Sequence, residues 1–204
     1  MNDNSAVYWM NGTMHNLEPD SRQAAAEGIV FAGSDMYVVG HVFNSADTAV
    51  QWKNGVRTSY SSDNGQDRVA YSVAVSGADV YAAGSYNNSP VYWKNGVITT
   101  LNTSISGERN GIGYAKSVTI AGTDVYVVGA YDSLGGILTA AYWKNGVLTP
   151  LENSQSNSSF ANGIAFAGND IYIVGAIISS DRSSSSPAYW KNGTPGKSHR
   201  QRRN

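Results

Sequence analysis

The chain repeats one short phrase four times. The phrase is Gly-x-Asp followed by a mostly apolar segment that ends in glycine, and it occupies residues 33–40, 77–84, 122–129 and 168–175. Its first glycines lie 44, 45 and 46 residues apart (77 − 33, 122 − 77, 168 − 122). A period in the forties, filled with short strand patterns and turn signals, is typical of β-propellers, in which each repeat is one small sheet. The sequence therefore predicts an all-β propeller of four-stranded antiparallel blades.

The copy at 115–151 shows the four predicted strands most clearly. Its first strand, 115–122, alternates small or apolar residues with period two, and Gly-x-Asp then turns the chain into a second strand at 124–129. The third strand, 140–144, ends in Tyr-Trp-Lys and is followed by Asn-Gly, which favours a two-residue hairpin turn of type I′. The fourth strand follows at 147–151, and its proline is tolerated because this is expected to be an outer edge strand.

The phrases define a propeller domain at 1–193, with units at about 24–60, 69–101, 115–151 and 161–191. Residues 6–17 correspond to the third and fourth strands of a unit, and the C-terminal unit breaks off after its third strand. Two closures remain open. The N-terminal fourth strand completes the C-terminal unit in a four-bladed ring, with one third strand left over, or two chains associate into a homodimeric ring of about eight blades.

Two kinds of side chain recur in every unit, and we expect them to build the blade rather than one site. An Asp follows Gly-x, where its carboxylate can accept hydrogen bonds from turn N–H groups. A Trp near the end of each third strand is expected to pack between sheets, covered in four of five copies by the aliphatic stem of the next Lys. These structural residues are Asp35, Asp79, Asp124, Asp170, Trp9, Trp52, Trp93, Trp143 and Trp190.

The order of the predicted strands and the positions of the turn residues resemble those of kelch-like propeller blades. The alternation of Tyr-Trp-Lys-Asn-Gly with Asp-Val-Tyr-Val-Val-Gly is similar to that of uncharacterised bacterial repeat proteins, many of them exported or at the cell surface. The resemblance covers about residues 6–193, but Gly129 is followed by Ala130 where kelch repeats usually carry a glycine pair. It implies a propeller and a secreted or cell-surface protein. It implies no reaction, because such families include enzymes, adaptors and lectin-like binders.

Composition excludes several classes of partner. Without the four cations of 197–203, ten Lys and Arg (14 − 4) face fifteen Asp and Glu, so the body is acidic and we expect no nucleic-acid partner. The absence of cysteine excludes disulfides and thiolate metal sites. No apolar run approaches the about 18 residues of a membrane helix, and residues 1–30 lack the pattern of an export signal. Residues 194–204 are expected to form a disordered basic tail.

A ligand site is expected where the copies differ. The Gly-x-Asp and Asn-Gly turns hardly vary, whereas the loops at the opposite strand ends vary in length and content, and such loops commonly carry specificity. One position just after the repeated Ala of the first strand also varies; we call its four residues the inner column. They would line a channel mouth, where a closed four-bladed ring would place Glu27 opposite Lys116, although a water-filled channel would accept any polar residue there. The candidate ligand-binding residues are Glu27, Tyr71, Lys116 and Asn162 of the inner column, and His41, Asp67, Arg68, Glu108, Arg109 and Asp132 of the loops.

Little in the sequence favours catalysis. The three histidines occupy unrelated positions of the repeat, and the motifs of serine hydrolases, zinc proteases and phosphate-binding loops are absent. A glycosidase-like carboxylate pair drawn from Glu27, Asp67 and Glu108 would depend on geometry. We therefore expect a non-enzymatic scaffold without metal or cofactor that binds a glycan or protein. The alternatives are a self-assembly module that closes a ring between chains, and a carbohydrate-active hydrolase or lyase at the channel mouth.

Overall fold

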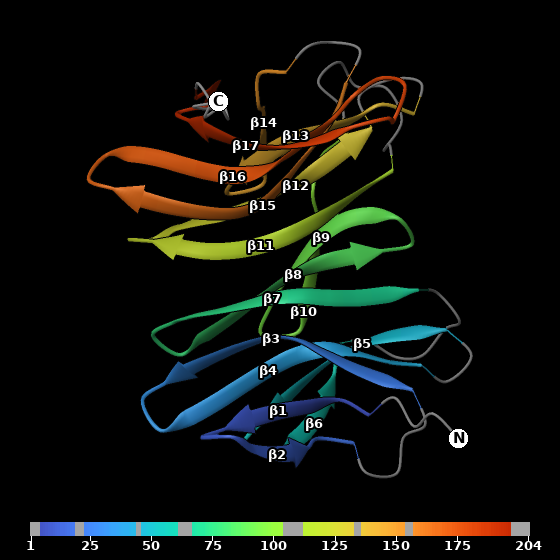
Figure 1. The fold of residues 1–204 in the computed structure, drawn as a ribbon. Helices are drawn as coiled ribbons and strands as arrows, with labels where there is room; N and C mark the ends of the chain where they lie inside the picture. The colour runs from blue at the N-terminus through green and yellow to red at the C-terminus, as the bar shows by residue number, and fades with distance from the viewer. Residues whose placement is uncertain are drawn as a thin grey trace.

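The computed structural model describes residues 5–18, 23–43, 46–60, 67–103, 112–132, 136–153 and 157–196. All regular structure in these ranges is β. Four four-stranded antiparallel sheets follow one another along the chain, preceded by a two-stranded hairpin. Figure 1 shows them stacked face to face in chain order. The prediction of a β-propeller of four-stranded antiparallel blades is confirmed.

Each blade is a meander whose strands we number first to fourth. The N-terminal hairpin contains β1 (Val7–Met10) and β2 (Thr13–Asn16). The first blade contains β3 (Ala24–Ala32), β4 (Asp35–Phe43), β5 (Asp47–Lys53) and β6 (Val56–Ser59). The second contains β7 (Arg68–Ser76), β8 (Asp79–Tyr86), β9 (Ser89–Lys94) and β10 (Val97–Thr100). The third contains β11 (Gly113–Ala121), β12 (Asp124–Asp132), β13 (Leu138–Lys144) and β14 (Val147–Pro150). The fourth contains β15 (Ser158–Ala167), β16 (Asp170–Ile178), β17 (Ser185–Lys191) and β18 (Thr194–Pro195).

The hairpin between the third and fourth strands has the turn that its sequence predicts. In the third blade Asn145 has φ of 51° and Gly146 of 83°. Two successive residues of positive φ define a type I′ turn, whose twist matches that of the flanking strands. The turn fixes the register so that Lys144 pairs with Val147.

A β-bulge in the first strand explains the glycine that ends the second. In the third blade the register shifts between Ala115 and Ser117, which leaves Lys116 unpaired. The bulge brings the two backbones so close that a Cβ on Gly129 would collide with the carbonyl oxygen of Tyr114. The same shift and the same collision recur in the other three blades, so only glycine fits at this point of the repeat.

The hydrophobic core lies between blades rather than within one. Val39 and Tyr60 of the first blade form one cluster with Ala70, Val91 and Trp93 of the second. Equivalent clusters join the second blade to the third and the third to the fourth. In each of them the Trp faces the preceding blade. Stability of such an array depends on nearest-neighbour interfaces, as in other repeat proteins.

The array is open at both ends, which corrects one of the two expected closures. β2 pairs with β1 in a separate two-stranded sheet, and the fourth blade has its own short fourth strand. Figure 1 places the hairpin and the fourth blade at opposite ends of the stack. The N-terminal strands therefore do not complete the C-terminal unit, because Ala6 and Leu17 pack on Val38 and Trp52 of the first blade.

The C-terminal segment also differs from expectation at its beginning. Thr194 and Pro195, which the sequence assigned to a disordered tail, form β18 and pair with Lys191 and Trp190. Residues 197–204 lie outside the described part of the chain. A fourth strand of two residues instead of four leaves the last blade shorter than the others.

Candidate functional site

The recurring Asp belongs to a network that locks the second strand to the third. In the third blade Lys144 Nζ lies 2.7 Å from Asp124 Oδ2 and 5.5 Å from the centroid of the Tyr126 ring. Asn145 donates from Nδ2 to Asp124 Oδ1 (2.8 Å) and accepts from the Val125 N–H (2.9 Å). The hydrogen bonds from Lys144 and then from Asn145 lower the pKa of Asp124 below its usual 3.8.

All four blades repeat this network, in which each Asp links the second strand to the third. Two details of the expectation were wrong. The Asp side chains accept hydrogen bonds from Lys and Asn side chains rather than from turn N–H groups. The Lys side chains extend over tyrosine rings of the second strand rather than over the Trp.

Four of the five tryptophans pack between neighbouring sheets. Trp52, Trp93, Trp143 and Trp190 are completely buried. The indole N–H of Trp143 donates to the Asn102 carbonyl of the preceding blade at 2.7 Å, and that of Trp190 donates to the Glu152 carbonyl at 2.8 Å. Trp9 differs: 64% of its surface is exposed, because no blade precedes the hairpin in this structure.

The inner column coincides with the bulges. Each of its residues is the unpaired residue of a register shift, and bulges commonly redirect side chains near functional sites. Two members meet, since Lys116 Nζ lies 4.3 Å from the centroid of the Tyr71 ring. Asn162 is exposed on the fourth blade. Glu27 does not face Lys116, because the second blade stands between their strands. It lines a cavity of about 240 Å³ beside the N-terminal hairpin.

The predicted loop residues fall into separate groups. His41 Nε2 lies 3.7 Å from Asp47 Oδ1, and the Asp47 N–H donates to Asp67 Oδ1 at 3.3 Å. Arg68 is buried, with its guanidinium 4.5 Å from the centroid of the Tyr86 ring. Asp132, at the end of β12, accepts the Gly136 N–H at 3.1 Å. Glu108 and Arg109 lie outside the described residues.

A cavity on the loop face between the third and fourth blades escaped the sequence analysis. It measures about 460 Å³, and its lining includes Leu138, Ser158, Phe160, Arg182 and Ser185. We call it the loop-face cavity. In the sequence this region shows only Arg182 beside four consecutive serines, a pattern that does not by itself indicate a site.

Hydrogen bonds order the loop that carries Arg182. Asp181 Oδ1 accepts from Ser179 Oγ (2.6 Å) and from Ser183 N and Oγ (3.0 and 2.7 Å). These bonds, that from Ser179 foremost, lower the pKa of Asp181 to about 2. Asp181 is therefore engaged within its own loop. Arg182 lines the cavity and supplies its cationic group.

Aromatic rings support the floor of the same cavity. Phe160 stacks on Tyr114 of the third blade, with ring centroids 6.2 Å apart and planes inclined by 13°. Burial, with a smaller effect of Tyr71, raises the pKa of Tyr114 to about 12, so this phenol stays neutral. The described residues contain no group of three His, Asp or Glu side chains arranged to hold a metal ion. None of the described segments is a helix long and apolar enough to cross a membrane.

The blade topology places the chain in the propeller class. No known protein family and no curated protein matches it. Among solved structures it is similar to the computationally designed Ika4 protein (12% identity, 84% of this chain and 93% of that one, TM-score 0.42). It is also similar to the designed Ika8 protein (13%, 94% and 70%, TM-score 0.37) and to a GH43 endo-arabinanase from Bacillus licheniformis (10%, 83% and 96%, TM-score 0.27). The class assignment rests on the blades themselves.

Proposed function

We propose that this chain is a non-enzymatic propeller scaffold that binds a glycan at the loop-face cavity. The observation that carries the proposal is the juxtaposition of the Phe160 ring with Arg182 and the hydroxyls of Ser158 and Ser185 in one cavity of about 460 Å³. A cavity of that size suits a ligand of a few sugar rings. The loops around it vary most between repeats, as expected for a specificity surface.

The chemistry of the wall favours a sugar that carries a carboxylate. An aromatic ring offers a flat apolar surface to the C–H face of a sugar, and serine hydroxyls can both donate to and accept from its hydroxyls. Arg182 adds a planar guanidinium, which binds a carboxylate with two parallel hydrogen bonds. Since the neighbouring Asp181 is held by Ser179 and Ser183, it does not neutralise that guanidinium directly.

The test is glycan-array screening of the full chain, followed by calorimetry with the best ligand. We expect Arg182→Ala and Phe160→Ala each to weaken binding about tenfold or more, equivalent to about 1.4 kcal/mol. Arg57→Ala is the matched control, because this arginine pairs with Glu18 at 3.2 Å on the first blade, far along the stack. An array without a hit, or binding that both cavity variants retain, would refute the proposal.

One further variant separates the cavity from the inner column. Tyr71→Ala removes the ring beneath Lys116 and leaves the loop-face cavity lining intact. Binding lost in Tyr71→Ala but kept in Arg182→Ala would move the site to the inner column. A hydrolase is the weaker alternative, since in the described chain Glu27 lines the cavity beside the N-terminal hairpin and Asp67 accepts the Asp47 N–H, so the two carboxylates have different partners.

A further inference from the structure

Among the described strands, the N-terminal hairpin corresponds to the third and fourth strands of a blade and pairs with no second strand. In complete blades the third strand is paired on both sides, as β5 is with β4 and β6, whereas β1 pairs with β2 alone. Its turn residue Asn11 has the same φ of 51° as Asn95 and Asn145. Those two asparagines hold an Asp of the second strand, but no carboxylate among the described residues meets Asn11.

The first blade is correspondingly uncovered where an inner half should lie. Ile29 and Phe31 of β3 are 50% and 62% exposed. Their equivalents are covered by the preceding blade: Val118 is buried, and the ring of Phe166 meets Tyr126 edge-on at 4.9 Å. With Trp9, Ile29 and Phe31 form what we call the N-terminal end face.

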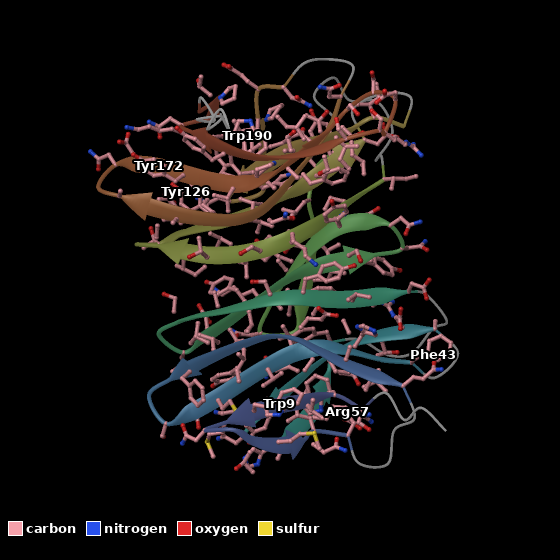
Figure 2. The ribbon with its side chains drawn as sticks, viewed as in Figure 1. Trp9, Phe43, Arg57, Tyr126, Tyr172 and Trp190 are labelled. Carbon is pink, nitrogen blue, oxygen red and sulfur yellow. The ribbon has the colours of Figure 1, made fainter. Side chains whose placement is uncertain are left out.

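The fourth blade presents the complementary surface. Val174 is 55% exposed, whereas its equivalents Val39, Ala83 and Val128 are completely buried. With Tyr172 it forms what we call the C-terminal end face. Figure 2 shows Trp9 at one end of the stack and Tyr172 at the other. Inside the chain Val39 lies in one cluster with Val73, the equivalent of Ile29, so the two end faces are the two halves of an interface that already occurs three times.

The two ends also carry nearly the same hairpin. Residues 8–13 read Tyr-Trp-Met-Asn-Gly-Thr and residues 189–194 read Tyr-Trp-Lys-Asn-Gly-Thr, which differ at one position. If the N-terminal end face of one copy met the C-terminal end face of another, β1–β2 of the first copy and β17–β18 of the second would compete for pairing with β16 of the second copy. The N-terminal hairpin has the better fourth strand, since β2 pairs over four residues and is followed by the buried Leu17, while β18 pairs over two.

We propose that the hairpin β1–β2 of one copy replaces β17–β18 in the fourth blade of a second copy of this chain. β15 and β16 of the second copy then form a complete blade with β1 and β2 of the first. By equivalence with β17, Val7 pairs with Gly175 and Met10 with Tyr172. Reciprocal exchange between two copies closes a ring of eight blades, three whole blades from each copy and two shared ones.

The exchange satisfies each uncovered group at the two ends. Trp9 enters the place of Trp190, where Leu151 packs and the Glu152 carbonyl accepts the indole N–H. Asn11 meets Asp170 as Asn192 does now at 2.8 Å. Ile29 covers Val174, and Phe31 meets Tyr172 as Phe166 meets Tyr126. Displacement of β17–β18 withdraws Trp190 from its buried place, which Trp9 takes, and removes the Lys191–Asp170 ion pair, because Met10 has no charge; an exposed pair contributes little to stability. It also takes Ser185 of β17 out of the lining of the loop-face cavity, so the exchanged dimer and the intact cavity are alternative states of the chain.

Solution mass and one engineered disulfide test the proposal. By light scattering after size exclusion we expect the unmodified chain near 43.4 kDa (2 × 21.7 kDa). The chain has no cysteine, so the double variant Met10→Cys, Tyr172→Cys can form one intermolecular disulfide in each shared blade. Under oxidising conditions we expect a disulfide-linked dimer on non-reducing gels. The position suits a disulfide because Asn192 N–H donates to Ile171 O, which makes the equivalent pair of Tyr172 a non-hydrogen-bonded one with close side chains.

The matched control is Lys191→Cys with Tyr172→Cys, which links β17 to β16 within one chain. In the exchanged dimer β17 is displaced, so we expect both cysteine thiols of this variant to remain unpaired in thiol assays. A monomer of 21.7 kDa at the highest attainable concentration, with the control disulfide formed, overturns the proposal. A dimer in which only the control disulfide forms also overturns it, because assembly would then use another surface. The mass of the unmodified chain decides even if a cysteine variant fails to fold.

Discussion

Trp143 and Trp9 occupy the same position of the repeat, one in the middle of the stack and one at its N-terminal end. The first is fully buried and donates to a carbonyl of the preceding blade, and the second is largely exposed. The sequence around them is nearly the same, so the difference comes from the neighbour and not from the repeat. In a nearly one-dimensional array each blade obtains half of its core from the blade before it. An end blade therefore exposes what an interior blade buries.

The largest expected effect is the difference between Trp143→Ala and Trp9→Ala. Removing the buried indole leaves a cavity between the second and third blades and should cost about 3–5 kcal/mol of unfolding free energy. For the monomer we expect Trp9→Ala to change stability by about 0.5 kcal/mol or less. Urea denaturation followed by circular dichroism at low protein concentration measures both. Equal losses would mean that Trp9 is buried in solution even in the monomer.

A second comparison concerns the glycine opposite the bulge. Gly129→Ala places a methyl group against the Tyr114 carbonyl oxygen, a backbone atom that cannot move aside, and should cost about 3 kcal/mol. Gly163→Ala is the control, since its new methyl group would lie in ordinary contact, 3.4 Å from Val174 Cγ2. We expect thermal melts to show a large loss for the first variant and a small one for the second. A small loss at Gly129 would mean that the bulge can open.

Asn95 and Asn11 give a smaller, well-matched difference. Both have φ of 51°, so replacing either by Ala adds the same backbone strain, which cancels in the comparison. Only Asn95 accepts the Val80 N–H, at 2.8 Å, and its loss should cost about 1 kcal/mol beyond the strain. The difference between Asn95→Ala and Asn11→Ala in monomer unfolding is the quantity to measure. If it is zero, the turn asparagine does not link the second and third strands.

The fold was predictable because every local signal agrees with it. The period, the Asn-Gly turns and the glycine at 129 each depend on neighbours within one unit, so one unit suffices to read them. The ends were not predictable in the same way. Trp9 has the sequence context of a core residue, but its burial depends on whether another blade packs on the hairpin, which the repeat itself does not encode.

The candidate site was predictable only in part, for a related reason. The inner column varies between units, and in the structure its residues are the unpaired residues of the β-bulges. No local sequence pattern predicts these bulges. The loop-face cavity forms between blades from loops distant in sequence, so Phe160 and Arg182 could not be associated before the blades were placed. Patterns within a unit predict the blade; contacts between units create the sites.

The smallest effects concern the Lys–Asp pairs and their dependence on pH. Hydrogen bonds from Lys94, then from Asn95, lower the pKa of Asp79 below 3.8, and the bond to Asp79 raises the pKa of Lys94 above 10.5. A lowered carboxyl pKa contributes stability above pH 3.8 that disappears as the pH falls through the lowered value. A raised lysine pKa contributes stability below pH 10.5 that disappears as the pH rises through the raised value. We therefore expect Lys94→Met to be slightly less stable than the parent at neutral pH, with a difference that vanishes at both extremes, in melts recorded across the pH range. A difference that does not depend on pH would show that the stem of Lys94 stabilises by packing alone.

Met10→Lys introduces, in the N-terminal hairpin, the lysine that the third strands of the four blades carry at the same position. The introduced lysine meets no aspartate in the monomer, because the N-terminal hairpin lacks a second strand of its own, so monomer melts should not change. In the exchanged dimer it would reach Asp170, which Lys191 now holds at 2.7 Å. We then expect a modest shift of the monomer–dimer equilibrium towards the dimer at neutral pH and none below the lowered pKa of Asp170, measured by sedimentation equilibrium. If the dimer affinity depends neither on the introduced lysine nor on the pH, residue 10 lies outside the dimer interface. The exposure of the N-terminal end would then have a cause other than a missing neighbouring blade.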